Sequence, residues 1–140
     1  MSLVRARVTA AALDPIGLEA AVRRSTAGAT VLFTGVVRDH DDGRDVAGLD
    51  YEAHPDAQEI LAVLLAEWLA ARPEVLAVGA EHRFGELEIG QVAFCAAVAA
   101  AHRAEAFAAC AEVVDLVKQS LPVWKHQRFT DGTSLWVGSA

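Results

Sequence analysis

Only two residues of this chain carry a primary side-chain amine, and both lie near its carboxyl end. The sequence has ten arginines but only two lysines, Lys118 and Lys125, which stand within a stretch of eight residues. A lysine amine can lose its proton and act as a nucleophile or proton carrier, whereas a guanidinium keeps its charge. The pair therefore indicates lysine-based chemistry. Two solvated lysines that favour the dipole at a helix end are the competing interpretation, which the spacing alone does not exclude.

Three further basic residues stand where predicted elements begin or end. Arg38 follows the apolar, β-branched residues 29–37, while His102 and Arg103 open the helix that ends with Lys118. We expect these ends to converge into one cationic pocket that suits a small phosphorylated substrate. Repulsion between like charges there would lower the pKa of a lysine and free its amine. The simpler alternatives are a helix cap for His102 and an ion pair with a nearby aspartate for Arg38.

Other common sites are not supported by the sequence. The acidic loop 38–45 has its glycine misplaced for an EF-hand, and no glutamate closes a twelve-residue loop. Cys95 and Cys110 lie in apolar surroundings without a C-x-x-C motif, which predicts reduced core thiols rather than a zinc site. No Gly-rich phosphate loop or H-E-x-x-H motif is present. We therefore expect neither a metal site nor a resident cofactor.

Length and charge restrict the class of protein. The 140 residues fit one domain, 1–140, and the net charge of −7 argues against nucleic acid or an anionic membrane as the partner. The longest uncharged run, residues 89–101, is shorter than the roughly 18 apolar residues of a membrane span. No cationic segment followed by an apolar one opens the chain. These features predict a cytoplasmic protein.

Hydrophobic periodicity and turn residues predict an α+β domain with mostly antiparallel pairing, in the order β-α-β-β-α-β-β-α-β-β. Residues 39–45 are expected to form a polar loop and residues 85–90 a hairpin-like connection. On the last helix, side chains at helical spacing predict a buried stripe of Phe107, Cys110, Ala111, Val114, Val117 and Leu121. The expected strands are residues 3–8, 29–37, 48–53, 75–84, 91–99, 123–129 and 134–137, and the expected helices are residues 14–25, 55–72 and 103–121.

Five segments occur in one order along the chain: residues 33–38 (FTGVVR), residues 82–90 (HRFGELEIG), residues 101–107 (AHRAEAF), Asp115 with Lys118, and residues 122–125 (PVWK). Together they resemble the large, catalytic subunit of molybdopterin synthase, the MoaE family, over about residues 29–136. The resemblance implies an α/β hammerhead with an additional antiparallel β-sheet. It also implies a homodimer that carries one small subunit at each outer end, and so a heterotetramer.

The resemblance implies a sulfurtransferase of molybdenum cofactor biosynthesis. Members of the family convert cyclic pyranopterin monophosphate (precursor Z) into the molybdopterin dithiolene. The sulfur arrives as a thiocarboxylate on the C-terminal Gly-Gly of a small ubiquitin-like partner, MoaD. A separate donor agrees with the placement of both cysteines in apolar surroundings. The alternatives are a non-catalytic α+β module that binds an anionic metabolite or a protein, and a lysine-dependent Schiff-base enzyme.

The resemblance also assigns roles to individual residues. Lys118 matches the active-site lysine nearest the donor's C-terminus, as acid/base or transient nucleophile, and Lys125 matches the one that assists at the pterin. The positions that match substrate-binding residues, partly across the dimer interface, are Val36, Val37, Arg38, His102, Arg103, His126 and Gln127. Many relatives have glutamate where this chain has Gln127, and some have lysine where it has Val36. A carboxylate role at the first position and a charge at the second are therefore not expected here.

Overall fold

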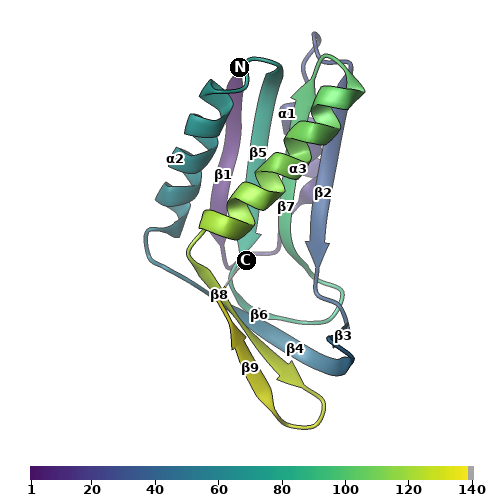
Figure 1. Ribbon diagram of the computed structural model, residues 1–140, viewed down its shortest axis with the longest axis vertical. Coiled ribbons are helices and arrows are strands. Elements are labelled where there is room, and N and C mark those ends of the chain that lie inside the picture. Colours follow the sequence, from purple (N-terminus) through teal and green to yellow (C-terminus); the bar gives the residue numbers. More distant parts are fainter. Residues whose placement is uncertain (139–140) are drawn as a thin grey trace.

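The computed structural model describes residues 1–138, which form two β-sheets and three helices (Figure 1). The α+β class and the order of the longer elements agree with the prediction. Two short strands, β3 and β6, are additional. Along the chain the elements are β1 (Ser2–Thr9), α1 (Pro15–Val22), β2 (Ala29–Val36), β3 (His40–Asp41), β4 (Arg44–Ala53), α2 (Ala57–Ala70), β5 (Val75–Arg83), β6 (Gly85–Leu87), β7 (Val92–Ala100), α3 (Arg103–Ser120), β8 (Val123–Phe129) and β9 (Ser134–Val137).

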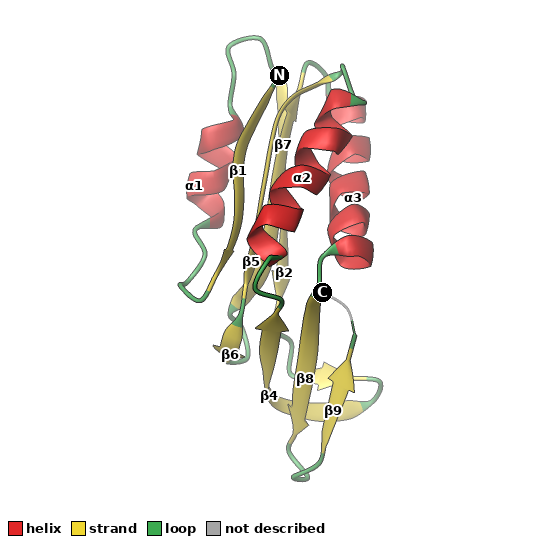
Figure 2. Cartoon of the chain, turned by 90° about the vertical axis from the view of Figure 1, so that its left-hand side faces the viewer, coloured by secondary structure: helices red, strands yellow, loops and turns green. Residues whose placement is uncertain are grey.

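The first sheet has the strand order β1-β5-β7-β2, with β1 parallel to β5 and the other pairs antiparallel. Helices α2 and α3 cover one face and α1 covers the other (Figure 2). Strand β7 is buried on both faces, and its alternating side chains divide between two clusters. Ala96, Val98 and Ala100 belong to the cluster under α2 and α3, whereas Cys95, Ala97 and Ala99 belong to the cluster under α1.

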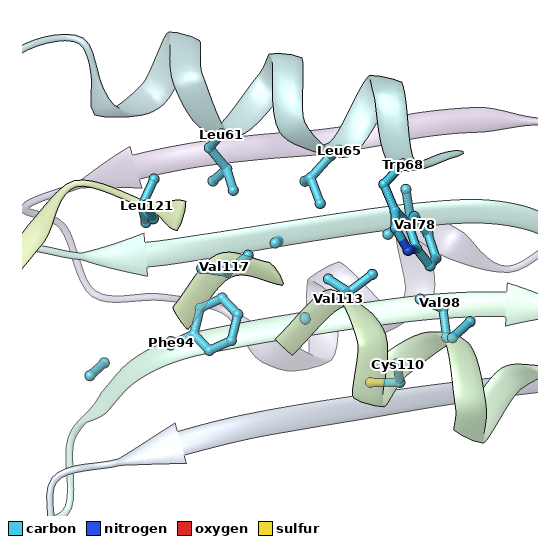
Figure 3. Packing of buried hydrophobic residues seen from close by; sticks show 14 of the residues in the cluster. Leu61, Leu65, Trp68, Val78, Phe94, Val98, Cys110, Val113, Val117 and Leu121 are labelled. Atoms are coloured by element: carbon cyan, nitrogen blue, oxygen red, sulfur yellow. The ribbon is translucent and has the colours of Figure 1, made fainter. Parts of the chain in front are cut away.

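The main core lies between the first sheet and helices α2 and α3 (Figure 3). Leu61, Leu65 and Trp68 recur at intervals of three and four residues along α2, so they lie on one helical face. Val113 and Val117 from α3 pack beside them above Val78 and Phe94, and all of these are buried. This packing fixes the position of α3, and therefore of Lys118 in its last turn.

The predicted buried stripe of α3 is partly wrong. Cys110, Val117 and Leu121 are buried as expected, but Ala111 is exposed, Val114 is only partly buried, and Phe107 is 63% exposed. The inward positions are instead Ala106, Ala109 and Val113. The helix is thus rotated about its axis relative to the prediction, and Phe107 and Val114 lie beside the edge strand β2, where they line an apolar groove.

The second sheet has the order β3-β4-β8-β9, and β6 pairs with β4. Residues 39–45 form a tight hairpin rather than the expected loop, because Asp42 and Gly43 both adopt positive φ and let β3 pair with β4. Similarly, β5 and β7 pair as predicted, but their connection contributes β6 to the second sheet. The connection therefore ties the two sheets together.

Two smaller features concern helices. Asp14 caps α1 by accepting a hydrogen bond from the backbone N–H of Gly17 at 3.1 Å, and Pro15 follows it as expected. The helix ends at Val22, earlier than the predicted residue 25, where the Arg23 N–H bonds to the Ala20 carbonyl. Within residues 1–138, no helix has the length and apolar character of a membrane span.

Candidate active site

A cavity of about 290 Å³ lies where the two sheets meet. From the first sheet, the carboxyl end of β2 and neighbouring parts of β5 and β7 reach it, and α3 contributes its last turn. From the second sheet, β3, β4 and β8 form the opposite wall. Its lining residues are Phe33, Gly35, Val36, Val37, Arg38, His40, Asp41, Val46, Leu49, Tyr51, His82, Ala93, Phe94, Lys118, Lys125 and Gln127.

Both lysines line this cavity. Lys118 is in the last turn of α3. Buried Leu121 and partly buried Pro122 then lead the chain directly into β8, which carries Lys125. In β8, Lys125 is paired in register with Tyr51 of β4, and side chains two residues apart share one face of a strand. Gln127 therefore lines the same wall as Lys125. The alternative of two solvated lysines at a helix end holds for Lys118, which is exposed in the last turn of α3, but not for Lys125, which is partly buried in β8.

Arg38 lines the cavity beside an acidic residue, Asp41. Its Nη2 atom lies 3.0 Å from Oδ1 of Asp41, so the predicted ion pair with an aspartate of the following segment is present. A hydrogen bond from Gln127 lowers the pKa of the Asp41 carboxyl, and the charges of Lys125 and Arg38 lower it further. Asp41 is thus ionised at neutral pH. The cavity is lined by three cations (Lys118, Lys125 and Arg38) and one carboxylate, so its net charge attracts an anion. The carboxylate offsets part of the repulsion between the cations.

The pKa of Lys125 is lowered, as the sequence predicted for a lysine in a cationic pocket. Burial is the largest cause, the positive charges of Lys118 and Arg38 add to it, and the Asp41 carboxylate opposes it. Like-charge repulsion, which the sequence suggested as the cause, is therefore secondary to desolvation. The lowered pKa increases the fraction of free amine at neutral pH, which suits proton transfer.

Sequence reasoning did not identify His82 as a site residue. It is completely buried near the end of β5, and its Nδ1 atom lies 2.8 Å from the carbonyl oxygen of Arg83. The ring of Tyr51 meets it edge-on at 4.8 Å, and the ring of Phe94 stacks at 5.7 Å. Burial lowers the pKa of His82 to about 4, with Lys118 contributing in the same direction. The sequence signal was a histidine between Glu81 and Arg83 at the end of β5, which equally fits a structural residue.

The expected convergence of His102 and Arg103 with Lys118 is wrong within one chain. Residues 102 and 118 are separated by sixteen positions, and a helix rises about 1.5 Å per residue, so roughly 24 Å separates the two ends of α3. His102 and Arg103 line a different hollow beside Gly28. His102 occupies the N-cap position, but its side chain makes no capping hydrogen bond.

Of the remaining predicted site residues, two line the cavity and one does not. Val36 and Val37 line the cavity, Val37 buried and Val36 about half exposed. His126 does not line it, because it alternates with Lys125 and Gln127 along β8 and stacks on Trp136, with 4.4 Å between ring centroids. Val36 is aliphatic, so it brings no charge to the site.

The two cysteines are core residues, as predicted. Both are buried and free, and burial raises the pKa of Cys95 to about 12 and that of Cys110 to about 11. A thiol of this kind is almost entirely protonated at neutral pH and is a poor nucleophile. Among residues 1–138, no three histidine, cysteine or acidic side chains gather in a way that could hold a metal ion.

Comparison with known proteins gives consistent results. The family model described as MoaE protein matches residues 8–120. A molybdopterin synthase catalytic subunit from a Nostoc species is 37% identical over 131 residues, covering 93% of this chain and 79% of the relative. The crystal structure of molybdopterin synthase from Staphylococcus aureus matches with a TM-score of 0.84 and 30% identity, covering 94% of this chain and 95% of that one. The fold is also shared, at 21% identity and a TM-score of 0.68, with 94% and 88% covered, by a Helicobacter pylori protein solved as a complex of subunits 1 and 2 of molybdopterin-converting factor.

Proposed function

The chain belongs to the MoaE family of molybdopterin synthase catalytic subunits, and we propose that its cationic cavity is where sulfur is transferred to cyclic pyranopterin monophosphate. It is thus a sulfurtransferase of molybdenum cofactor biosynthesis. The observation that carries the assignment of the site is the meeting of Lys118, Lys125 and Arg38 in one cavity of an otherwise acidic protein. Three cations in a partly enclosed site hold a phosphate well, because both charge and hydrogen bonds favour it.

The sulfur comes from outside this chain. Cys95 and Cys110 are buried away from solvent and have raised pKa values, so neither can carry a reactive thiolate. The donor is the C-terminal thiocarboxylate of a small ubiquitin-like subunit, whose extended tail reaches the cavity. Lys118 acts next to the thiocarboxylate, and Lys125, with its lowered pKa, exchanges a proton at the pterin. Two free thiols agree with a reducing, cytoplasmic location.

A second protomer completes the site. His102 and Arg103 lie at the far end of α3 from the cavity of their own chain, in a hollow that is open to solvent. In a two-fold dimer the same surfaces of both protomers meet, so the two cavities gain the same residues from the opposite chain. His102 and Arg103 of each protomer then contribute to phosphate binding in the other, within a heterotetramer of two large and two small subunits.

The assignment of Lys118 is tested by replacing it with alanine. Product formation is measured from cyclic pyranopterin monophosphate and thiocarboxylated partner, and we expect kcat to fall by about 10²-fold or more. Arg23→Ala is the matched control, because this cation lies in a salt bridge with Glu19 outside the cavity. Near-normal turnover by a folded Lys118→Ala protein would favour the non-catalytic binding module.

The contribution across the dimer has a separate test. Lys118→Ala and Arg103→Ala chains are each expected to be weakly active, and they are then mixed under conditions that exchange subunits. Half of the dimers in an equal mixture are heterodimers, and one of their two sites has both residues intact, so activity should recover to about a quarter of wild type. No recovery above the separate variants would mean that Arg103 does not serve the opposite cavity.

A further inference from the structure

Two residues that line the cavity each have a buried acceptor atom without a hydrogen-bond partner. His82 is completely buried and its Nε2 atom is unpaired, and Gln127 is 4% exposed with an unpaired Oε1 atom. Both residues line the cavity that contains Lys118 and Lys125. Buried polar atoms without partners are rare in folded proteins, because leaving them unpaired costs free energy. Two of them on residues that line one cavity point to a group that binds there.

Neighbouring groups determine which atoms are the acceptors. A carbonyl oxygen only accepts, so the contact to the Arg83 carbonyl places the proton of His82 on Nδ1 and leaves a lone pair on Nε2. Because burial lowers the pKa of His82 to about 4, the ring stays neutral at pH 7. Gln127 donates a hydrogen bond to the ionised Asp41 carboxylate. Its amide nitrogen therefore faces Asp41, and its oxygen is the atom without a partner.

A phosphate group does not satisfy these two atoms. Its ionised oxygens accept hydrogen bonds, and the cations Lys118, Lys125 and Arg38 are suited to donate them. The unpaired His82 Nε2 and Gln127 Oε1 atoms require a different part of the ligand, one that carries N–H or O–H donors. A reduced pterin has such an edge in its amino group and ring N–H groups.

We propose that His82 and Gln127 form a subsite that accepts hydrogen bonds from the donor edge of the pterin while the cations hold its phosphate. This inference rests on the proposed function. His82 is held in place by its Nδ1 hydrogen bond and by the rings of Tyr51 and Phe94, so its lone pair is oriented before the ligand arrives. A site built in this way discriminates strongly against a ligand without donors, because its acceptors then stay buried and unpaired.

The test compares two ligands with variants that keep or remove the acceptor. Binding of cyclic pyranopterin monophosphate and of dimethyl phosphate, a phosphate diester without O–H donors, is measured by calorimetry on the full chain. In His82→Asn the amide replaces Nδ1 but leaves nothing at the position of Nε2. We expect it to weaken pterin binding about tenfold or more and to leave phosphate binding within about twofold. His82→Gln, whose amide oxygen reaches the position of Nε2, should recover part of the loss.

Turnover gives a second readout. The KM for the pterin should rise in His82→Asn, while the KM for the thiocarboxylated partner should not change. If His82 had a purely structural role, both of its variants would bind the two ligands equally weakly. Both would also lose thermal stability to a similar extent. If His82→Asn does not fold, Gln127→Met removes the other acceptor and allows the same comparison of pterin and phosphate binding.

The outcomes separate this inference from the proposed function. If Lys118→Ala weakens binding of both ligands and neither acceptor variant changes pterin binding, the subsite is wrong and the atoms are satisfied by water. Equal losses for pterin and phosphate in the acceptor variants would overturn it as well. If Lys118→Ala changes the binding of neither ligand, the cavity itself is not the substrate site, and both proposals fail.

Discussion

The buried histidine makes the stability of this protein depend on pH in a predictable way. His82 has a pKa of about 4 in the folded chain, against about 6.5 when exposed. Between these values the unfolded chain binds a proton that the folded chain does not, so acid favours unfolding. The stabilising contribution is complete above about pH 6.5 and is lost as the pH falls to about 4. A difference of about 2.5 pKa units corresponds to about 3 kcal/mol.

The measurement is urea unfolding at a series of pH values from 7 to 4, at a fixed protein concentration because any self-association would add to stability. Carboxyl groups also titrate in this range, so the informative quantity is the difference between wild type and His82→Gln. This difference in unfolding free energy should shrink by about 3 kcal/mol from pH 7 to pH 4. His54→Gln, at a half-exposed position, controls for the loss of an imidazole from the surface. Parallel curves for wild type and His82→Gln would refute the reasoning, because His82 would then titrate alike in both states.

Three further predictions follow from the same structure. Lys125→Arg keeps the charge but cannot release a proton, so it should bind inorganic phosphate within a few-fold of wild type and lower kcat by about 10²-fold or more; an unchanged kcat would contradict the proton-transfer role. Leu61→Ala should lower the free energy of unfolding in urea by about 2–5 kcal/mol, whereas Val63→Ala, half exposed on the same helix, should change it by less than about 1 kcal/mol. Iodoacetamide at pH 8 should label neither Cys95 nor Cys110 in the native protein and both in urea, as counted by mass spectrometry, and rapid native labelling would contradict their burial.

The longer elements were predictable because their side chains alternate, as in β1, or repeat at helical spacing, as in α2. The inward face of α3 was not, because alanine is small enough for both a buried and an exposed position. Ala106 and Ala109 face the core while Ala111 faces solvent, and no difference in their chemistry separates them. The packing of α3 beside α2 decides the rotation of the helix, and that information lies in contacts between distant residues.

The candidate site likewise combines features that residue type reveals with features that only the folded structure reveals. Lys118 and Lys125 could be identified from residue type alone, because lysine is rare in a chain that otherwise uses arginine for positive charge. The convergence of Lys118 with His102 could not hold in one chain, because the predicted helix between them was already long enough to keep them apart. His82 was missed for a different reason. It follows Glu81 in a mostly apolar strand, and only the folded structure shows that one of its ring nitrogens has no partner.

The composition of the cavity depends on the register between β4 and β8. Lys125 pairs with Tyr51 and Gln127 pairs with Leu49, so both polar side chains face the cavity while His126 between them faces away. A shift of one residue would exchange these faces and bring His126, together with Trp124 or Arg128, to the positions where Lys125 and Gln127 now lie. Val123 and Phe129 lie on the same face of β8 and are buried, so they oppose that shift, which would expose both side chains. The hydrophobic burial that joins the two sheets therefore also determines which cation and which amide line the cavity.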